Sequence, residues 1–146
     1  MMHKKFYASG FLYHSPSQQI LLQQYTQPSS ATASPWHLFN GVYTENDDQD
    51  KVFKNIIFDL LHVKIETVHT VYSYFKEDTG IHHAIVYAEL DTLQNFPSKK
   101  GLTFSWFSFK GVTKLPVTEQ TKHDIVVGQR VIDAIRRKSE GEHTFQ

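Results

Sequence analysis

The chain has 146 residues, of which 40% are hydrophobic and 21% charged, so it fits one soluble globular domain and not a disordered chain. Lysine plus arginine balances aspartate plus glutamate at 15 each, so the net charge gives no general attraction to nucleic acids or acidic membranes. The sequence contains no cysteine, which excludes disulfides, zinc–thiolate sites and cysteine nucleophiles.

The N-terminal part predicts three strands, rich in aromatic and aliphatic residues, at 5–14, 18–25 and 36–43. A Ser-Pro-Ser turn separates the first two strands. A polar loop bounded by prolines is expected at 26–35, and such loops lie on the surface. Within the third strand, Asn40-Gly41 is a signal for a turn or a bulge.

The clearest pattern in the chain predicts a helix from about Asp48 to His62. Apolar residues recur there at spacings of three and four, as one buried helix face requires: Val52, Phe53, Ile56, Ile57, Leu60 and Leu61. Asp47, Asp48 and Asp50 fall before or in the first turn, where aspartate caps a helix and the helix dipole favours negative charge. We therefore interpret these three residues first as capping groups and second as metal contacts.

A hairpin is predicted in the middle of the chain, where strands 63–77 and 81–90 flank the tight-turn sequence Asp78-Thr79-Gly80. Strand side chains alternate between the two faces of a sheet. In the first strand, Val71, Ser73 and Phe75 should therefore lie on one face, and Tyr72 and Tyr74 on the other. His82 and His83 are adjacent in the second strand and must point to opposite faces. They therefore cannot chelate one metal ion together.

The C-terminal part predicts an aromatic strand at 102–112 and a last helix at about 118–138. The buried side of this helix is expected to carry Ile125, Val126, Val131, Ile132 and Ile135. Residues 139–146 are expected to form a loose tail.

The order of the elements is strand, strand, strand, helix, hairpin, strand, helix. Helices packed on a mixed sheet give an α+β fold, arranged as an α/β/α sandwich. Because no internal repeat or linker is visible, we predict a single domain over residues 1–146, with a core at about 5–138.

This order resembles that of the Nudix hydrolase family, in which a glycine loop after a short strand leads into a helix. The family's box reads G-x5-E-x7-R-E-U-x-E-E-x-G-U, with U a bulky aliphatic residue. The lead-in WHLFNG and the downstream segment FSWFSFKGVTKLP, each with a tryptophan, are similar to the corresponding parts of the family. The resemblance covers nearly the whole chain and implies a Nudix-like α/β/α sandwich with a mixed sheet.

Aligned on Gly41, the box keeps few of its functional residues. Its glycine and aliphatic positions match at Gly41, Ile57 and Val63, while Asp47 and Asp59 are acidic replacements for glutamates. The departures are Asn55 for the arginine, Ile56 and Leu60 for two glutamates, and His62 for the late glycine. The resemblance therefore implies a degenerate box, from which no catalytic residue is assigned.

The carboxylates of the box have a physical role that this chain can fill only in part. Helix positions 56, 59 and 60 share one face, where three carboxylates would converge on a magnesium ion. That metal would stabilise charge on a diphosphate and help to activate water. Ile56 and Leu60 cannot bind a hard cation, and Asn55 cannot pair with a carboxylate as arginine does. Asp59 alone retains an oxygen ligand, and its other interpretation is a solvated helix residue.

Three hypotheses for the function follow, and they leave open whether the protein is an enzyme. The first is a protein that resembles hydrolases of nucleoside-diphosphate-linked compounds, has weak or absent hydrolysis and binds a nucleotide-like ligand. The second is an active hydrolase whose Mg²⁺ or Mn²⁺ site is rearranged around Asp59, Asp47 and the backbone near Gly41. The third is a protein-interaction module in which Ile56 and Leu60 are exposed; otherwise these two residues belong to the core.

Lys99 and Lys100 are the candidate ligand-binding residues. They lie in PSKKGLTF, where the family often supplies a further glutamate and this chain has no acidic residue. Lysines in this position can contact a phosphate, or they can form an ordinary solvated loop.

The remaining expectations concern location and partners. The chain shows neither a signal peptide nor an apolar run of about 18 residues, so we expect a cytoplasmic protein that does not enter membranes. Basic and aromatic residues do not alternate densely, so we expect no nucleic-acid partner. A homodimer is compatible with the sequence.

Overall fold

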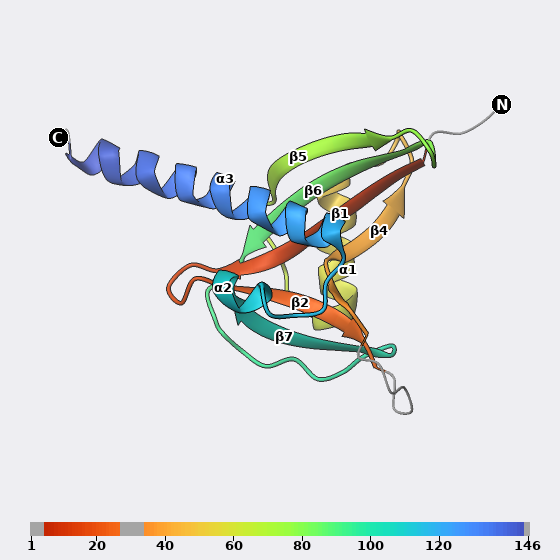
Figure 1. Cartoon of the computed structure of the whole chain (residues 1–146), viewed down its shortest axis with the longest axis horizontal. Helices are drawn as coiled ribbons and strands as arrows, with labels where there is room; N and C mark the ends of the chain where they lie inside the picture. Colours follow the sequence, from red (N-terminus) through yellow and green to blue (C-terminus); the bar gives the residue numbers. More distant parts are fainter. Residues whose placement is uncertain (1–4, 27–33, 145–146) are drawn as a thin grey trace.

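The computed structural model of the chain describes residues 5–26 and 34–144. Its strands are β1 (Lys5–His14), β2 (Gln19–Tyr25), β3 (Trp36–His37), β4 (Phe39–Tyr43), β5 (His69–Lys76), β6 (Ile81–Glu89) and β7 (Leu102–Ser108). Its helices are α1 (Gln49–Leu61), α2 (Phe109–Val112) and α3 (Glu119–Thr144). Figure 1 shows these elements in one body, from which the C-terminal half of α3 projects.

The described strands form one mixed sheet in the order β3-β2-β1-β6-β5, with β4 paired to β1 and β7 paired to β2. β1 and β6 run parallel, whereas the other pairs are antiparallel. β1 is the central strand, and its neighbouring residues Phe11 and Leu12 are both fully buried although they point to opposite faces. This two-sided burial requires a layer on each face of the sheet.

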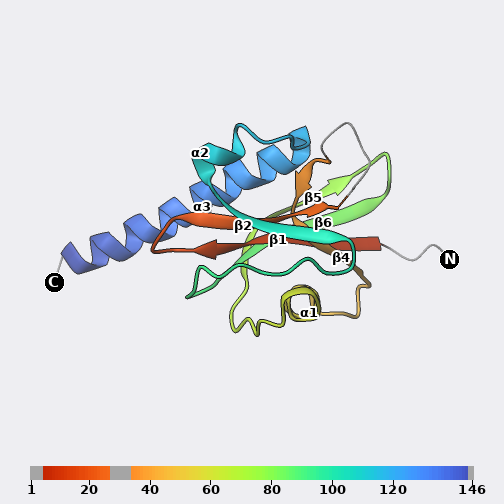
Figure 2. The same ribbon diagram turned by 90° about the horizontal axis from the view of Figure 1, so that it is seen from below.

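Those two layers are helical. Figure 2 shows α1 below the sheet and α2 with α3 above it. Phe53, Ile57 and Leu61 of α1 join the core cluster on the first face, and Ile125 and Ile132 of α3 join the cluster on the second. The predicted α+β fold, an α/β/α sandwich with a mixed sheet, is confirmed.

The capping of α1 follows the expected chemistry. The N-cap Asp48 accepts a hydrogen bond from the backbone N–H of Asp50 at 3.0 Å. At the other end, His62 adopts a left-handed conformation with φ of 56°, and its backbone N–H donates to the carbonyl of Phe58 at 2.9 Å. The helix therefore ends within one residue of each predicted boundary.

The interpretation of Asn40-Gly41 as a turn or a bulge was wrong. Gly41 lies inside β4, which pairs with β1 in unbroken register from Phe39 to Tyr43. The break in the predicted strand falls at Leu38, between β3 and β4. A turn signal in the sequence was overridden because the strand gains a full ladder of hydrogen bonds with the central strand.

The predicted face of Val71 was also wrong. A β-bulge between Thr70 and Tyr72 interrupts the pairing of β5 with β6. It brings Val71 to the same core cluster as Tyr72 and Tyr74. The strand itself starts at His69, later than the predicted residue 63, because the preceding segment forms a loop.

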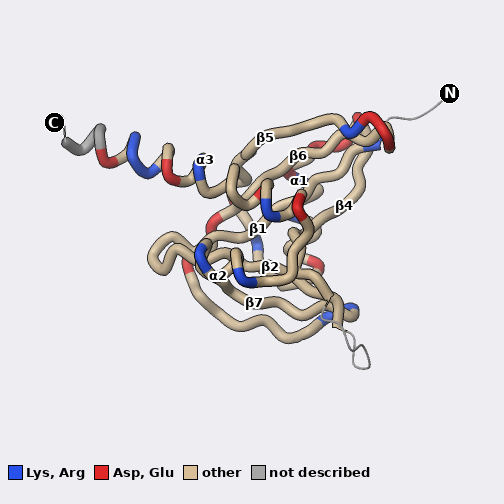
Figure 3. The backbone as a smooth tube through the Cα atoms, viewed as in Figure 1, with Lys and Arg blue, Asp and Glu red and all other residues tan. Residues whose placement is uncertain are grey.

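The C-terminal helix differs from the prediction in its length and its buried face. α3 runs to Thr144, so residues 139–144 are helical where a loose tail was expected, and 145–146 lie outside the described residues. Ile125 and Ile132 are buried as predicted, Val131 is half-buried, and Val126 and Ile135 are exposed. Lysine and arginine alternate with acidic residues along the projecting part of the helix (Figure 3).

The segment after β6 and the loop after β2 were also predicted from the sequence. The expected strand 102–112 ends at Ser108, whose side chain caps the short helix α2 by accepting from the Gly111 N–H at 2.9 Å. Most of the loop expected at 26–35 lies outside the described residues.

No helix in the described part of the chain combines the length and the apolar character that a membrane crossing needs.

Candidate functional site

The flank of α1 that faces β4 carries the positions where the box would place its carboxylates. Ile56 and Leu60 are half-buried and pack against the core cluster on this face of the sheet. Neither belongs to the large exposed apolar residues of the described surface. The expectation that they belong to the core is therefore borne out in part, and they do not form an exposed docking face.

Gly41 and Ile56 meet at the point where β4 and α1 approach each other. A Cβ atom built on Gly41 would lie 2.3 Å from Cδ1 of Ile56 and 3.1 Å from its Cγ1. The Ile56 side chain thus occupies the space directly over the glycine. Glycine is needed here for close approach of the strand to the helix, and not for a turn. The alignment on Gly41 proposed from the sequence puts a glutamate of the box at position 56, and here this position carries a hydrocarbon group.

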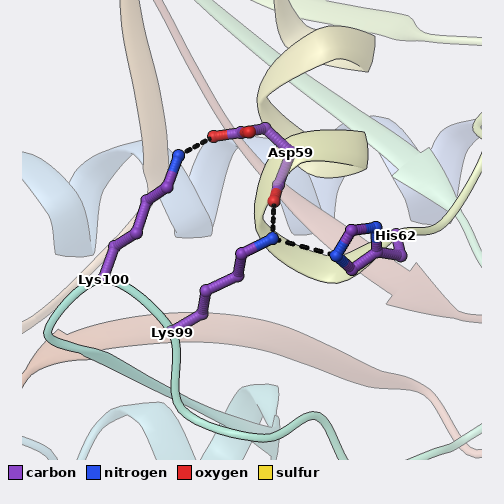
Figure 4. A network of polar contacts seen from close by, with 4 residues as sticks. All are labelled: Asp59, His62, Lys99 and Lys100. Carbon is purple, nitrogen blue, oxygen red and sulfur yellow. Dashed lines mark hydrogen bonds and ion pairs between the residues drawn. The ribbon is translucent and has the colours of Figure 1, made fainter.

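Asp59 lies on the same flank and is held by two lysines from the loop before β7 (Figure 4). The Lys100 ammonium forms an ion pair of 2.5 Å with the Asp59 carboxylate. The Lys99 ammonium donates to the backbone carbonyl of Asp59 at 2.5 Å and lies 2.9 Å from Nε2 of His62. Three of the residues singled out in the sequence, Asp59, Lys99 and Lys100, are therefore brought together, and His62 joins them.

The loop geometry explains why the two lysines reach α1. Lys99 and Leu102 exchange two backbone hydrogen bonds of 3.0 Å, which closes a four-residue turn. The two central residues have positive φ, 54° at Lys100 and 76° at Gly101, as a type I′ turn requires. Glycine adopts this conformation freely, whereas lysine does so at a cost. Lys100 is thus a non-glycine residue in a left-handed conformation, with its side chain on Asp59.

The electrostatics of this network agree with its geometry. The hydrogen bond and the charge of Lys100 lower the pKa of Asp59 below its ordinary value of 3.8. Lys99 also binds the carbonyl end of α1, where the helix dipole attracts a cation. The side chains of Lys100 and Asp59 remain 57% and 61% exposed, so the network stays open to solvent and to a ligand.

The residues of this flank do not fit a divalent metal. Its oxygen donor, the Asp59 carboxylate, already neutralises Lys100, and a second cation beside that ammonium would be repelled. Ile56 and Leu60 add no oxygen. Within residues 5–26 and 34–144, no three His, Asp or Glu side chains gather as a cation site.

Asp47 lies far from this flank. Its carboxylate accepts hydrogen bonds from the backbone N–H and the hydroxyl of Thr44 at 3.0 and 3.1 Å, in the turn before α1. The N-cap Asp48 is separated from Asp59 by about 16 Å along the helix, at 1.5 Å per residue. One ion therefore cannot bind Asp47 and Asp59 together.

A second polar cluster lies on the opposite face of the sheet and was missed in the sequence. Asp124 of α3 is only 4% exposed, and it accepts hydrogen bonds from the Tyr72 hydroxyl at 2.5 Å and from Gln120 at 2.8 Å. Burial raises the pKa of Asp124, and the two hydrogen bonds partly oppose this rise. Burial and the nearby Asp124 also raise the pKa of Tyr74 to about 12.

Helical spacing could have revealed Asp124. Thr121, Ile125, Gly128 and Ile132 are the buried residues around it, at steps of three and four. Asp124 falls within this stripe, so an unpaired carboxylate there would be costly. A Cβ on Gly128 would lie 2.8 Å from the ring of Phe11, which shows how closely α3 packs on β1.

His82 and His83 point to opposite faces, as predicted. His82 stacks on Phe6 with ring centroids 4.8 Å apart, and His83 stacks on Tyr74 at 4.7 Å. Both histidines are therefore members of cross-strand ring pairs.

An open groove of about 660 Å³ lies on the other flank of α1. Its lining, which we name the lysine groove, consists of Lys51, Lys54, Asn55 and Phe58 of α1 with Lys64, Ile65 and Glu66 of the following loop. Asn55, which the alignment proposed from the sequence puts at the arginine position of the box, lines this groove.

Comparison with known proteins identifies the fold. No protein-family model matches the chain, and no curated protein matches it. The ORF135 protein of E. coli superposes with a TM-score of 0.67 at 15% identity, over 91% of this chain and 94% of that chain. A NUDIX hydrolase from Nitrosomonas europaea superposes with a TM-score of 0.61 at 10% identity, over 87% and 89%.

A third structure, from work on MutT of Aliivibrio salmonicida and Vibrio cholerae, superposes with a TM-score of 0.63 at 11% identity, over 86% of this chain and 93% of that chain. Identities this low establish the fold and not the activity. The chain therefore has the fold of Nudix hydrolases.

Proposed function

We propose that this protein binds a nucleotide-like ligand and has weak or absent metal-dependent hydrolysis. The observation that carries the proposal is the ion pair between Lys100 and Asp59, the one box carboxylate retained on this flank of α1. An ammonium group stands beside that carboxylate where a catalytic metal would need to bind it. The protein thereby supplies its own cation.

The apolar side chains beside Asp59 support the same function. A magnesium ion needs several oxygen ligands in octahedral geometry. Ile56 fills the space over Gly41, and Leu60 packs on the core, so neither offers an oxygen or a place for water there. This flank of α1 therefore lacks the ligands for a metal ion that would activate a water molecule.

Ligand binding rests on Lys99 and Lys100. Each ammonium has three donors, and Lys100 uses one of them on Asp59. Asp59 acts as a positioning residue that holds Lys100 beside α1 and leaves two donors of its ammonium group for a ligand. The two lysines outweigh Asp59 by one positive charge, which favours the phosphates of a nucleotide-like ligand.

Turnover of a nucleotide panel tests the hydrolytic part of the proposal. The panel contains nucleoside triphosphates, dinucleoside polyphosphates, ADP-ribose and nucleotide sugars, each with Mg²⁺ or Mn²⁺. We expect no turnover, or equal traces in the wild type and in Asp59→Asn. Metal-dependent turnover that disappears in Asp59→Asn would contradict the proposal and support a hydrolase with a rearranged metal site.

Calorimetric titration of the same compounds in the presence of EDTA tests the binding part. A compound that binds without metal should lose affinity in Lys99→Gln/Lys100→Gln. The matched control is Lys114→Gln, an exposed lysine that follows α2 on the other side of the sheet, which should bind as the wild type does. Equal affinity in all three proteins would exclude the two lysines as the binding residues.

A further inference from the structure

The lysine groove is lined by more positive than negative side chains. Three lysines and one glutamate line it, which gives a local charge of +2 in a chain whose formal net charge is zero. Within the described residues the ion pairs are Lys100–Asp59 and Arg136–Asp133, and neither uses a groove lysine. Lys51, Lys54 and Lys64 are therefore available to an anion from outside.

The groove also has an apolar surface suited to a ring. Phe58 is 55% exposed, which is unusual for a phenylalanine on a helix. One side of its ring meets the edge of His62, with centroids 6.0 Å apart at 73°. Ile65, buried in the core, adds an apolar wall. An exposed ring beside unpaired ammonium groups fits a ligand with both a planar and an anionic part.

The helix fixes the spacing between these groups. Lys51 and Lys54 are three residues apart and share one face of α1, so their ammonium groups can hold the same phosphate. Phe58 follows four residues after Lys54, a rise of about 6 Å along that face. Lys64 approaches from the loop after α1. The anion-binding end and the ring-binding end are thus separated by about one helical turn.

We propose that the lysine groove binds a small organic phosphate that carries a planar ring. The phosphate contacts Lys51, Lys54 and Lys64, and the ring packs on Phe58. Asn55 and Glu66 supply a donor, an amide acceptor and a carboxylate acceptor for polar groups of the ring or its linker. The volume of about 660 Å³ lies in the usual range for small-molecule sites. The lysines neutralise the phosphate, so binding needs no metal.

The lining of this groove shares no residue with the site proposed above, although His62 contacts both Phe58 and Lys99. The test is a two-dimensional NMR titration of ¹⁵N-labelled full-length protein, with EDTA present. The probes are AMP, adenosine and inorganic phosphate. AMP should shift the amide signals of residues 51–58 and 64–66 in a saturable way, and adenosine or phosphate alone should bind at least about tenfold more weakly.

Variants assign the two ends of the groove. Lys51→Gln/Lys54→Gln should weaken AMP binding about tenfold or more, as expected for lost hydrogen bonds between charged groups. Phe58→Ser should bring the affinity for AMP close to that for phosphate and leave phosphate binding unchanged. Lys110→Gln/Lys114→Gln, on the opposite side of the sheet, should leave AMP binding unchanged.

Three outcomes would overturn the inference. Shifts confined to residues 98–101 would place the ligand on the other flank and leave the proposed function intact. Phosphate binding as tight as that of AMP and insensitive to Phe58→Ser would mean an adventitious ion only. Absence of saturable shifts at millimolar AMP would mean that the groove binds no such ligand.

Discussion

The contact between Gly41 and Ile56 shows how one side chain closes the space beside α1. The glycine has no Cβ, and the Ile56 Cδ1 atom lies where that Cβ would be. Each residue therefore constrains the other. A chain with a carboxylate at position 56 would place a charge in the same half-buried position, which is costly unless a cation compensates it.

Gly41→Ala should lower the free energy of unfolding by about 1 to 3 kcal/mol, because the added methyl group overpacks the contact. Chemical denaturation with urea measures the change. Ile56→Val removes the Cδ1 atom, so Gly41→Ala should cost much less in an Ile56→Val background. Equal costs of Gly41→Ala in both backgrounds would show that Ile56 does not fill this space.

The pairing of Asp59 with Lys100 predicts a specific titration. The pKa of Asp59 lies below 3.8 in the folded protein, so the pair adds stability above pH 3.8 and loses it as the pH falls through the folded pKa. Lys100→Gln should raise the pKa of Asp59 towards 3.8, as measured by ¹³C NMR of its carboxyl carbon. Lys99→Gln should raise it less, since Lys99 binds the carbonyl and not the carboxylate.

A pKa of Asp59 that stays unchanged in Lys100→Gln would contradict the ion pair. A larger rise of the Asp59 pKa in Lys99→Gln than in Lys100→Gln would mean that Lys99, and not Lys100, is the main cation beside the carboxylate.

At the scale of elements, α3 packs through a narrow stripe. Its buried residues between Thr121 and Ile132 fall on one face of the helix, and its side chains are exposed from Ala134 to Glu140. The apolar pattern in the sequence continues to Ile135, but Ile135 is 48% exposed. The C-terminal half of α3 projects from the body of the protein (Figure 1). Periodicity predicts which residues share a helix face, and the length of the neighbouring element decides how many of them are buried.

Ile132 and Ile135 allow a matched test of this packing. Ile132→Ala should lower the free energy of unfolding by about 2 to 4 kcal/mol, because it leaves a cavity in the core. Ile135→Ala should change it by less than about 0.5 kcal/mol, because its side chain is already exposed. Urea denaturation measures both. Similar losses in the two variants would mean that α3 is rotated from the described orientation, or is covered by a partner.

At the scale of the whole molecule, the sequence was sufficient for the fold class and insufficient for the site. Alternation and helical spacing predict β1, β2 and α1 well, because their burial follows directly from local pattern. The Asp59–Lys100 pair spans 41 residues and depends on a type I′ turn with lysine at a position that usually carries asparagine, aspartate or glycine. No local pattern predicts such a contact.

The stability of the whole protein should depend on pH through Asp124, which joins α3 to β5 through a hydrogen bond with Tyr72. Its folded-state pKa is raised above 3.8, so its contribution to stability is full below pH 3.8 and is lost as the pH rises through the folded pKa. Asp124→Asn keeps an oxygen acceptor and does not titrate. The melting temperature of Asp124→Asn relative to wild type should therefore rise between pH 3.5 and pH 7. A constant difference over this range would show that the pKa of Asp124 is not raised by folding.

The measurement that most directly tests the central claim is an NMR titration of the wild type with Mn²⁺, a paramagnetic ion that broadens the signals of nuclei near it. The claim is that Lys100 takes the place of a divalent cation beside Asp59. We predict no selective broadening of the amide signals of residues 40–42 and 56–60, in the wild type as in Asp59→Asn. Selective broadening of these signals in the wild type that disappears in Asp59→Asn would show that Asp59 binds a metal and would contradict the account.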